Sequence, residues 1–210
     1  MKKLLFLFII GSAWSLAQGS AGEDASYEPR YLIDLPTAGI IPHGAFSADF
    51  EFYQQNGLLL YANIGLFDLL TAGISYGGTE IVGNGSPVWN EVPGFSLRIR
   101  VINESIFIPA ILFGFDSQGK ESFDRGLDRY AVKSPGFYLV ASKNYRLLGN
   151  LSLHGGVNYS LERGDGDRDP NLYLGAEKSI GPSLSAIGEY NLGWNDSNSK
   201  ALGRGRGYLN

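Results

Sequence analysis

Residues 150–162 read "NLSLHGGVNYSLE", and their side chains alternate between apolar and polar. The apolar set is Leu151, Leu153, Val157, Tyr159 and Leu161, and the polar set is Asn150, Ser152, His154, Asn158, Ser160 and Glu162. Successive side chains of a β-strand point to opposite faces, so the segment predicts a strand with one apolar face and one polar face. The apolar face would suit a protein core or lipid, and the polar face bulk water or a lumen. The neighbouring segments must decide between these surroundings.

The same alternation recurs along the chain. It is found at 46–53, 58–66, 70–76, 95–101, 137–144, 172–177 and 183–194. Residues 106–115 are apolar at both odd and even positions, and they include Pro109, which has no N–H to donate to a neighbouring strand. We count them as the least regular strand. With the final residues as the start of one more, the pattern predicts an all-β chain of about ten antiparallel strands.

The predicted connections differ in length in a regular way. Short turns at 67–68, 103–105, 147–149 and 181–182 alternate with longer loops at 78–93, 116–134, 163–170 and 195–203. An up-and-down sheet with all short turns at one end would produce this order, and transmembrane barrels have that asymmetry. The segments are also longer than a typical globular strand of about five or six residues, and aromatic residues gather near their ends. We therefore expect an antiparallel up-and-down transmembrane β-barrel over 45–210. The alternative is a secreted soluble β-sandwich or barrel.

The N-terminus predicts export. Lys2 and Lys3 precede the apolar run 4–10, and small residues near Ala17 suit a signal peptidase. The run is shorter than the roughly 20 residues of a spanning helix. We therefore expect a secretory signal at 1–17, the alternative being a short buried helix. Residues 18–44 contain three prolines and are interpreted as a periplasmic lead-in, although they could also fold into the barrel mouth.

Composition narrows the chemistry and the partners. The chain has no cysteine, which excludes disulfides, thiolate metal sites and N-terminal lipidation. Its 17 basic and 21 acidic residues are nearly balanced, which argues against a nucleic-acid partner. No sequence feature calls for a cofactor. The expected partners are outer-membrane lipid, lipopolysaccharide and the barrel-assembly machinery.

Four stretches resemble the YjbH-like outer-membrane barrels of Gram-negative bacteria. They are "IDLPTAGIIPHG" (33–44), "GFYLVASKNY" (136–145), "LHGGVNYS" (153–160) and "IGEYNLGWND" (187–196). The family accompanies exopolysaccharide production, so the resemblance implies a non-enzymatic barrel in the cell outer membrane with polysaccharide-export components as partners. Barrels of this type usually end on a terminal aromatic residue, whereas this chain ends at Asn210.

Several charged residues lie on the polar face of the predicted strands or in line with it. They are Asp49, Glu51, Arg98, Arg100, Arg146, Glu162, Glu177 and Glu189. Charges at membrane depth are tolerated only where they face a lumen and pair there. They could line a channel, or they could form a salt-bridged plug. About ten strands enclose little open space, so the plug is the favoured interpretation.

Ser152 and His154 lie two residues apart and share a face of one strand. Lipid-hydrolysing barrels use a histidine and a serine at this spacing, but in the order His-x-Ser and facing lipid. Here the order is reversed and both side chains are expected in the lumen, where no oxyanion donor can be assigned. We interpret them as lumen hydrogen-bonding groups. A lipid-modifying barrel enzyme is the alternative.

Asp165, Asp167 and Asp169 alternate as in calcium-binding loops. The glycine and the bidentate glutamate of an EF-hand loop are absent. A solvated loop, with Gly164 and Gly166 supplying turn conformations, is therefore predicted.

The tenth predicted strand is short. From Arg204 to Asn210 it has about seven residues, whereas a membrane crossing needs roughly 9–11. Bacterial single-chain barrels also have even strand numbers. We therefore expect the natural gene to continue past Asn210.

Overall fold

The computed structural model describes residues 28–181, 184–197 and 206–210. The predicted signal at 1–17 lies outside these residues, as do residue 182 of one predicted turn and residues 198–203 of one predicted loop. Within the described ranges every regular element is a β-strand. No helix in this part of the chain is long and apolar enough to cross a membrane.

One large antiparallel sheet forms the molecule, and each strand pairs with the next on its path. In spatial order the strands are β1 (Phe46–Tyr53), β2 (Gly57–Leu66), β3 (Leu70–Thr79), β5 (Gly94–Ile102), β6 (Ala110–Asp116), β9 (Gly136–Arg146), β10 (Asn150–Tyr159), β11 (Asn171–Ser179), β12 (Ser185–Asn191) and β13 (Tyr208–Leu209). The short β4 (Val88–Trp89) pairs with β3, and β7 (Lys120–Asp124) pairs with β8 (Arg129–Val132) as a separate hairpin. The prediction of an all-β, antiparallel sheet of about ten strands is confirmed.

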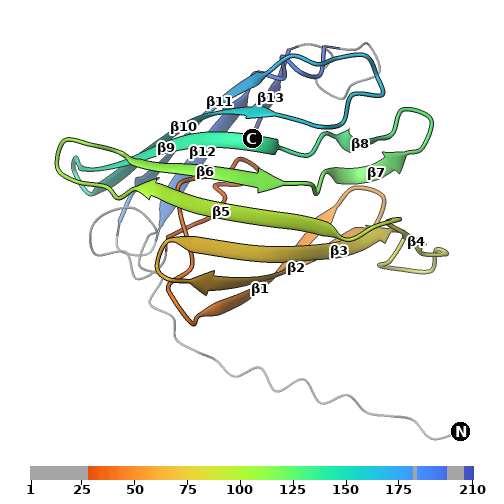
Figure 1. Ribbon diagram of the computed structural model, residues 1–210, viewed down its shortest axis with the longest axis horizontal. Coiled ribbons are helices and arrows are strands. Elements are labelled where there is room, and N and C mark those ends of the chain that lie inside the picture. Colours follow the sequence, from red (N-terminus) through yellow and green to blue (C-terminus); the bar gives the residue numbers. More distant parts are fainter. Residues whose placement is uncertain (1–27, 182–183, 198–205) are drawn as a thin grey trace, which may run out of the picture.

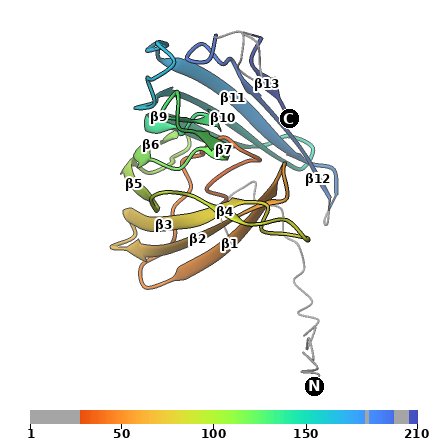
Figure 2. The same cartoon turned by 90° about the vertical axis from the view of Figure 1, so that its right-hand side faces the viewer.

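The sheet curls around an interior that also holds the N-terminal part of the described chain (Figure 2). Among the described residues, the pairing path runs from β1 to β13, and no assigned pairing joins β1 to β12 or β13. The long connections 80–93, 117–135 and 160–170 lie at one end, which we call the loop end. The turns 67–69, 103–109 and 147–149 lie at the other, the turn end (Figure 1).

Burial is reversed relative to a water-soluble sheet. On β10 the side chains of Leu153 and Val157 are exposed on the convex face, whereas Ser152 and Asn158 are buried on the concave face. The pattern is general: the exposed side chains include more than thirty large hydrophobic residues, and the buried set is dominated by polar and charged ones. The convex surface is therefore apolar and the interior polar.

Two tyrosines fill the interior by lying over glycines on neighbouring strands. A Cβ atom at Gly114 would lie 2.2 Å from the ring of Tyr138, and one at Gly156 would lie 2.4 Å from the ring of Tyr173. Only glycine leaves room for a ring this close to the backbone. Both tyrosines belong to a small buried cluster that also contains Leu35 and Ala38.

Three predicted segments need correction. The predicted strand 183–194 ends at Asn191, before Gly193 turns the chain with a φ of 64°. The predicted strand 106–115 begins at Ala110 instead, because Pro109 cannot donate to the ladder, and Ile106 and Phe107 are exposed in the preceding turn. The predicted loop 116–134 contains the hairpin of β7 and β8. Its pairing is short and irregular, so the alternation that identifies longer strands is weak there.

Candidate functional site

Residues 28–41 form a bent segment inside the curled sheet, which we call the inner hairpin. Its two legs meet through a bridge between Tyr31 and Pro36, and the Thr37 amide donates to the Arg30 carbonyl at 2.9 Å. The sequence left open whether this region is a periplasmic lead-in or enters the barrel mouth. The described part of the predicted lead-in lies in the interior, because polar side chains of the surrounding strands bind its backbone.

Two arginines of β5 hold the legs of the inner hairpin. The Arg98 side chain donates to the carbonyl oxygens of Arg30 and Thr37 at 2.7 and 2.6 Å, and to that of Gly39 at 3.2 Å. Arg100 donates to the carbonyl oxygen of Ala38 and forms a salt bridge with Glu28. Both guanidinium groups are buried. The sequence placed these arginines in the interior, and their partners are largely backbone carbonyls.

Glu189 of β12 binds the tip of the inner hairpin. Its carboxylate accepts hydrogen bonds from the amides of Ile33, Asp34 and Leu35 at 2.9–3.1 Å. A buried carboxylate surrounded by backbone N–H donors is a strong, charge-assisted arrangement. The tip is therefore fixed to the strand on the opposite side of the interior from β5.

Further contacts tie the inner hairpin to four other strands. Arg30 forms a salt bridge with Asp49 of β1, and the Tyr31 hydroxyl donates to Asp116 of β6 at 2.6 Å. The amide of Ala38 donates to Ser142 of β9, and that of Ile41 to Thr71 of β3. The inner hairpin is thus bound from several directions and fills the middle of the interior.

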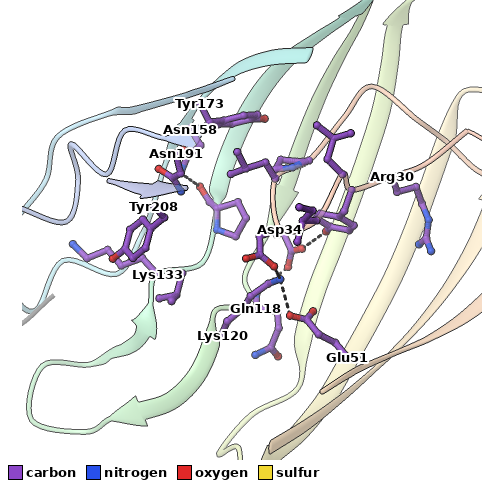
Figure 3. Close-up of a pocket in the computed structure, with 18 of the residues that line it drawn as sticks. Arg30, Asp34, Glu51, Gln118, Lys120, Lys133, Asn158, Tyr173, Asn191 and Tyr208 are labelled. Carbon is purple, nitrogen blue, oxygen red and sulfur yellow. Dashed lines mark hydrogen bonds and ion pairs between the residues drawn. The ribbon is translucent and has the colours of Figure 1, made fainter. Parts of the chain in front are cut away.

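A cavity lies on each side of the inner hairpin. The loop-end cavity has a volume of about 500 Å³ and is lined by the hairpin tip, β1, β7 and β10–β13 (Figure 3). The turn-end cavity has a volume of about 670 Å³ and is lined by Arg100, Glu104, Ser142, Ser152 and His154 among others. The inner hairpin therefore separates two chambers, each lined by a mixture of polar and apolar side chains.

Ion pairs organise the loop-end cavity. Lys120 of β7 bridges Asp34 at the hairpin tip and Glu51 of β1, with a Lys120–Glu51 separation of 2.6 Å (Figure 3). Burial alone would lower the pKa of Lys120, but the two carboxylates outweigh it and raise the pKa above the usual lysine value. Lys120 is therefore a fully charged link between the inner hairpin and the loop end.

A buried ionic cluster locks the loops over this cavity. Arg129 of β8 lies 2.5 Å from Asp165 and 2.7 Å from Asp196, and Lys133 lies 2.8 Å from Asp165. These three carboxylate contacts join the β7–β8 hairpin, loop 160–170 and the segment after β12. The interpretation of Asp165 as solvated is wrong, since its side chain is fully buried between two cations. Gly166 does adopt the predicted turn conformation, with φ of 87°.

Ser152 and His154 do not bind each other. Ser152 donates to Asn144, and His154 Nδ1 lies 2.7 Å from Ser142 Oγ. The same Ser142 oxygen accepts the Ala38 amide at 2.8 Å, so the inner hairpin covers it. His154 therefore supports the hairpin through Ser142, whereas the Ser152 hydroxyl is bonded to Asn144 and has no contact with His154.

The remaining candidates lie at different depths. Glu177 is buried opposite Ser152 in the β10–β11 register. Arg146 is exposed at the end of β9, at the rim of the turn-end cavity. Glu162 lies beyond β10, where its carboxylate accepts the amides of Tyr130 and Ser134 and supports the β7–β8 hairpin.

Several important residues were missed from the sequence. Asp116 continues the inward parity of Leu112 and Gly114, so the alternation of β6 could have identified it. Lys133 and Asp196 lie in loops, and Arg129 begins the four-residue β8, which is too short for a periodicity to mark an inward side chain. The arginines of β5 bind backbone carbonyls of the inner hairpin, and no residue type in the sequence marks a carbonyl as a binding partner.

Comparisons with known proteins do not assign the chain to a family. No known protein family, curated protein or solved structure matches the chain. Within the described residues, no group of three or more histidine, aspartate or glutamate side chains is arranged to hold a metal ion.

Proposed function

We propose that the protein is a non-enzymatic β-barrel of the bacterial outer membrane, closed by its own inner hairpin, with a channel or structural role in the envelope and in polysaccharide export. The observation that carries this proposal is the reversed burial of the sheet. Exposed leucine, phenylalanine and valine side chains cover the convex face, while arginine and glutamate side chains are buried inside. Such a surface is unfavourable in water and suits the hydrocarbon of a bilayer.

The interior supports a channel closed at rest. Two chambers of about 500 and 670 Å³ lie on either side of the inner hairpin. Besides a small apolar cluster at Leu35 and Ala38, the hairpin is bound by hydrogen bonds and ion pairs, and water can replace these polar contacts if the hairpin moves. Displacement of this segment would join the two chambers into one path through the interior.

The membrane proposal sets a requirement on the two ends of the pairing path, at β1 and at β12 and β13. Unpaired backbone N–H and C=O groups in hydrocarbon cost several kcal/mol each. The proposal therefore requires that the edge at β1 and the edge at β12 and β13 are paired in the membrane.

Electrophoresis without boiling tests this proposal. We expect the mature protein to fractionate with outer membranes, to need detergent for extraction, and to migrate differently before and after boiling. A protein that stays soluble without detergent and runs identically in both cases would be a secreted β-sheet protein instead.

Lipid A analysis tests the enzyme alternative. Mass spectra of lipid A should be the same with and without the protein. Loss of an acyl chain that is reversed by His154→Ala would instead identify a lipid-modifying enzyme.

A further inference from the structure

We propose that the loop-end cavity binds an uncharged molecule with a single hydrocarbon chain, such as a monoacylglycerol, which enters from the bilayer. The proposal rests on the proposed function, because a membrane supplies a molecule of this kind at the edge of the sheet. Four observations carry it: the apolar wall of the cavity, the bonding of its polar groups, the pairing of its charges, and its opening beside β1.

The accessible wall of the loop-end cavity is more apolar than polar. Ile33, at the tip of the inner hairpin, lines the cavity and leaves 46% of its surface exposed, although the hairpin lies inside the curled sheet. Hydrocarbon that displaces water from such a surface is stabilised by the hydrophobic effect. The volume of about 500 Å³ lies within the roughly 300–1,000 Å³ range of small-molecule pockets. Further apolar side chains of the wall are Leu32, Leu35, Pro36, Val132 and Pro135.

Polar side chains of the wall are bonded to other protein groups. Asn171 of β11 donates to Asn158 of β10 at 3.0 Å and to Asn191 of β12 at 2.7 Å. The Gln118 side chain donates to the carbonyl oxygen of Gly119 at 2.7 Å. A strongly polar ligand would have to compete with these hydrogen bonds, whereas a hydrocarbon chain leaves them intact.

The charges of the cavity disfavour an anionic head group. The cations of the described wall are each paired: Arg30 with Asp49, Lys120 with Asp34 and Glu51, and Lys133 with Asp165. Asp116 and Asp196 also line the cavity, so carboxylates outnumber cations in its wall. An anionic head group would have to displace an ion pair and would face like charges. An uncharged head group avoids both costs.

The cavity opens sideways at β1. Its wall includes Asp49 and Glu51 on the concave face of this strand and Phe50 and Phe52 on the convex face. A cavity that touches both faces of one strand passes around an edge of that strand, and the other edge of β1 is paired with β2. Tyr208 of β13 lines the opposite side of the cavity from Glu51 (Figure 3). The opening therefore lies between β1 and β13, beside phenylalanine side chains of the convex face.

This opening is compatible with the edge pairing that the proposed function requires. Phe46 pairs with Ile64 near the turn 67–69, so residues 46–48 lie toward the turn end and 49–52 toward the loop end. Residues 46–48 and 185–188 remain available for pairing with each other. The loop-end half lies toward the membrane surface, where water can bond to backbone groups that hydrocarbon cannot satisfy.

Photolabelling of the full chain in lipid vesicles tests the proposal. The neutral probe is a monoalkyl glycerol with a diazirine in its chain, and the anionic probe is the alkyl sulfonate with the same chain and diazirine. Mass spectrometry maps the labelled peptides, and labelling of the convex face of β10 corrects for the amount of each probe in the bilayer. We expect saturable labelling of residues 32–36 by the neutral probe, competed by monomyristin, and much weaker labelling by the sulfonate.

Matched variants locate the site. Ile33→Asn should weaken labelling of the hairpin tip about tenfold, because an apolar side chain of the wall is lost. Ile33→Leu should be labelled as the wild type. Ile106→Asn, at an exposed isoleucine of the turn end, should also leave the labelling unchanged. Each variant is first checked for a heat-dependent shift in migration, so that a folding failure is separated from a binding failure.

The outcomes separate the ligand site from the proposed function. Labelling confined to the convex face, equal labelling of the tip in Ile33→Asn and the wild type, or preference for the sulfonate would overturn the ligand site. These results would leave the proposed function standing for a protein found in outer membranes. Saturable labelling of the tip in a protein that is absent from outer membranes would refute the proposed function and leave the ligand site standing.

Discussion

The Nη2 atom of Arg98 lies 2.6 Å from the carbonyl oxygen of Thr37, and the same atom lies 2.7 Å from the carbonyl oxygen of Arg30. Thr37 and Arg30 are on opposite legs of the inner hairpin. One guanidinium group, 1% exposed, therefore clamps both legs to β5. The hairpin is held in the interior by a side chain that the sequence assigned to the lumen.

Arg98→Lys should release the inner hairpin. A lysine ammonium cannot reproduce the planar fork that binds three carbonyl oxygens at once. In planar lipid bilayers, the variant should show more frequent or larger conductance events than the wild type. Arg168→Lys, at an exposed arginine in loop 160–170, is the matched control and should behave as the wild type. Equal conductance for Arg98→Lys and the control would show that Arg98 does not hold the hairpin.

Glu189→Gln should loosen the hairpin tip. The substitution replaces one carboxylate oxygen by an NH₂ group that faces the amides of residues 33–35. Loss of a charge-assisted contact of about 1.5–3 kcal/mol should raise hydrogen exchange of these amides by roughly tenfold or more. Glu104→Gln, which changes a carboxylate at the turn end, should leave them protected. Unchanged exchange in Glu189→Gln would contradict the assigned contact.

The face of the sheet on which each side chain of a long strand lies was predictable, because alternation places every second side chain on the same face. Ser152 and Arg98 are buried and Leu153 is exposed, as the pattern of their strands predicts once the apolar face is placed outside. Period-two alternation is independent of what the faces contact. Alternation therefore predicts which face of the sheet a side chain occupies, but it does not predict which group that side chain binds.

The partners could not be predicted. Arg98 binds carbonyl oxygens about sixty residues away, and a carbonyl looks the same at every position in a sequence. The inner hairpin also lacks alternation, because its backbone bonds go to side chains rather than to a neighbouring strand. The cluster of Arg129 and Asp165 joins separate loops, where side-chain direction follows from local turns.

The loop end should open in acid. Burial alone would raise the pKa of Asp165, but hydrogen bonds from Lys133 and Arg129 outweigh it, so its pKa lies below the usual value. The stabilisation from a carboxylate of this kind is present above the unfolded pKa of about 3.9 and is lost as pH falls through the lower folded pKa. Hydrogen exchange at residues 165–169, where the Asp167 amide donates to Asp165 and the Asp169 amide to Asp167, should therefore stay slow at about pH 5 and rise below about pH 3 after correction for intrinsic rates.

Asp165→Asn should expose the same amides already at neutral pH, because the two cations would lose their shared carboxylate. Asp169→Asn, an exposed aspartate in the same loop, should have no effect. Full protection in Asp165→Asn would show that the ionic cluster does not hold the loops.

Leu153→Arg should destabilise the protein in a bilayer. Leu153 lies near the middle of β10 on the convex face, and arginine at the bilayer midplane of a barrel costs about 2–4 kcal/mol. Leu148→Arg, in the turn between β9 and β10, should cost little because that residue is 96% exposed at the sheet end. Reversible urea unfolding in lipid vesicles measures both. Equal costs would place Leu153 outside hydrocarbon.

Spin labels along β10 test most directly whether the convex face contacts lipid. The chain has no cysteine, so single cysteines at residues 151–158 can be labelled without background. In lipid vesicles we expect high collision rates with oxygen, and low rates with a water-soluble nickel complex, at Leu153 and Val157. Labels at Ser152 and Asn158 should show low oxygen collision rates, which gives an alternation of period two. High nickel accessibility at Leu153 and Val157, equal to that of a surface loop, would contradict the account.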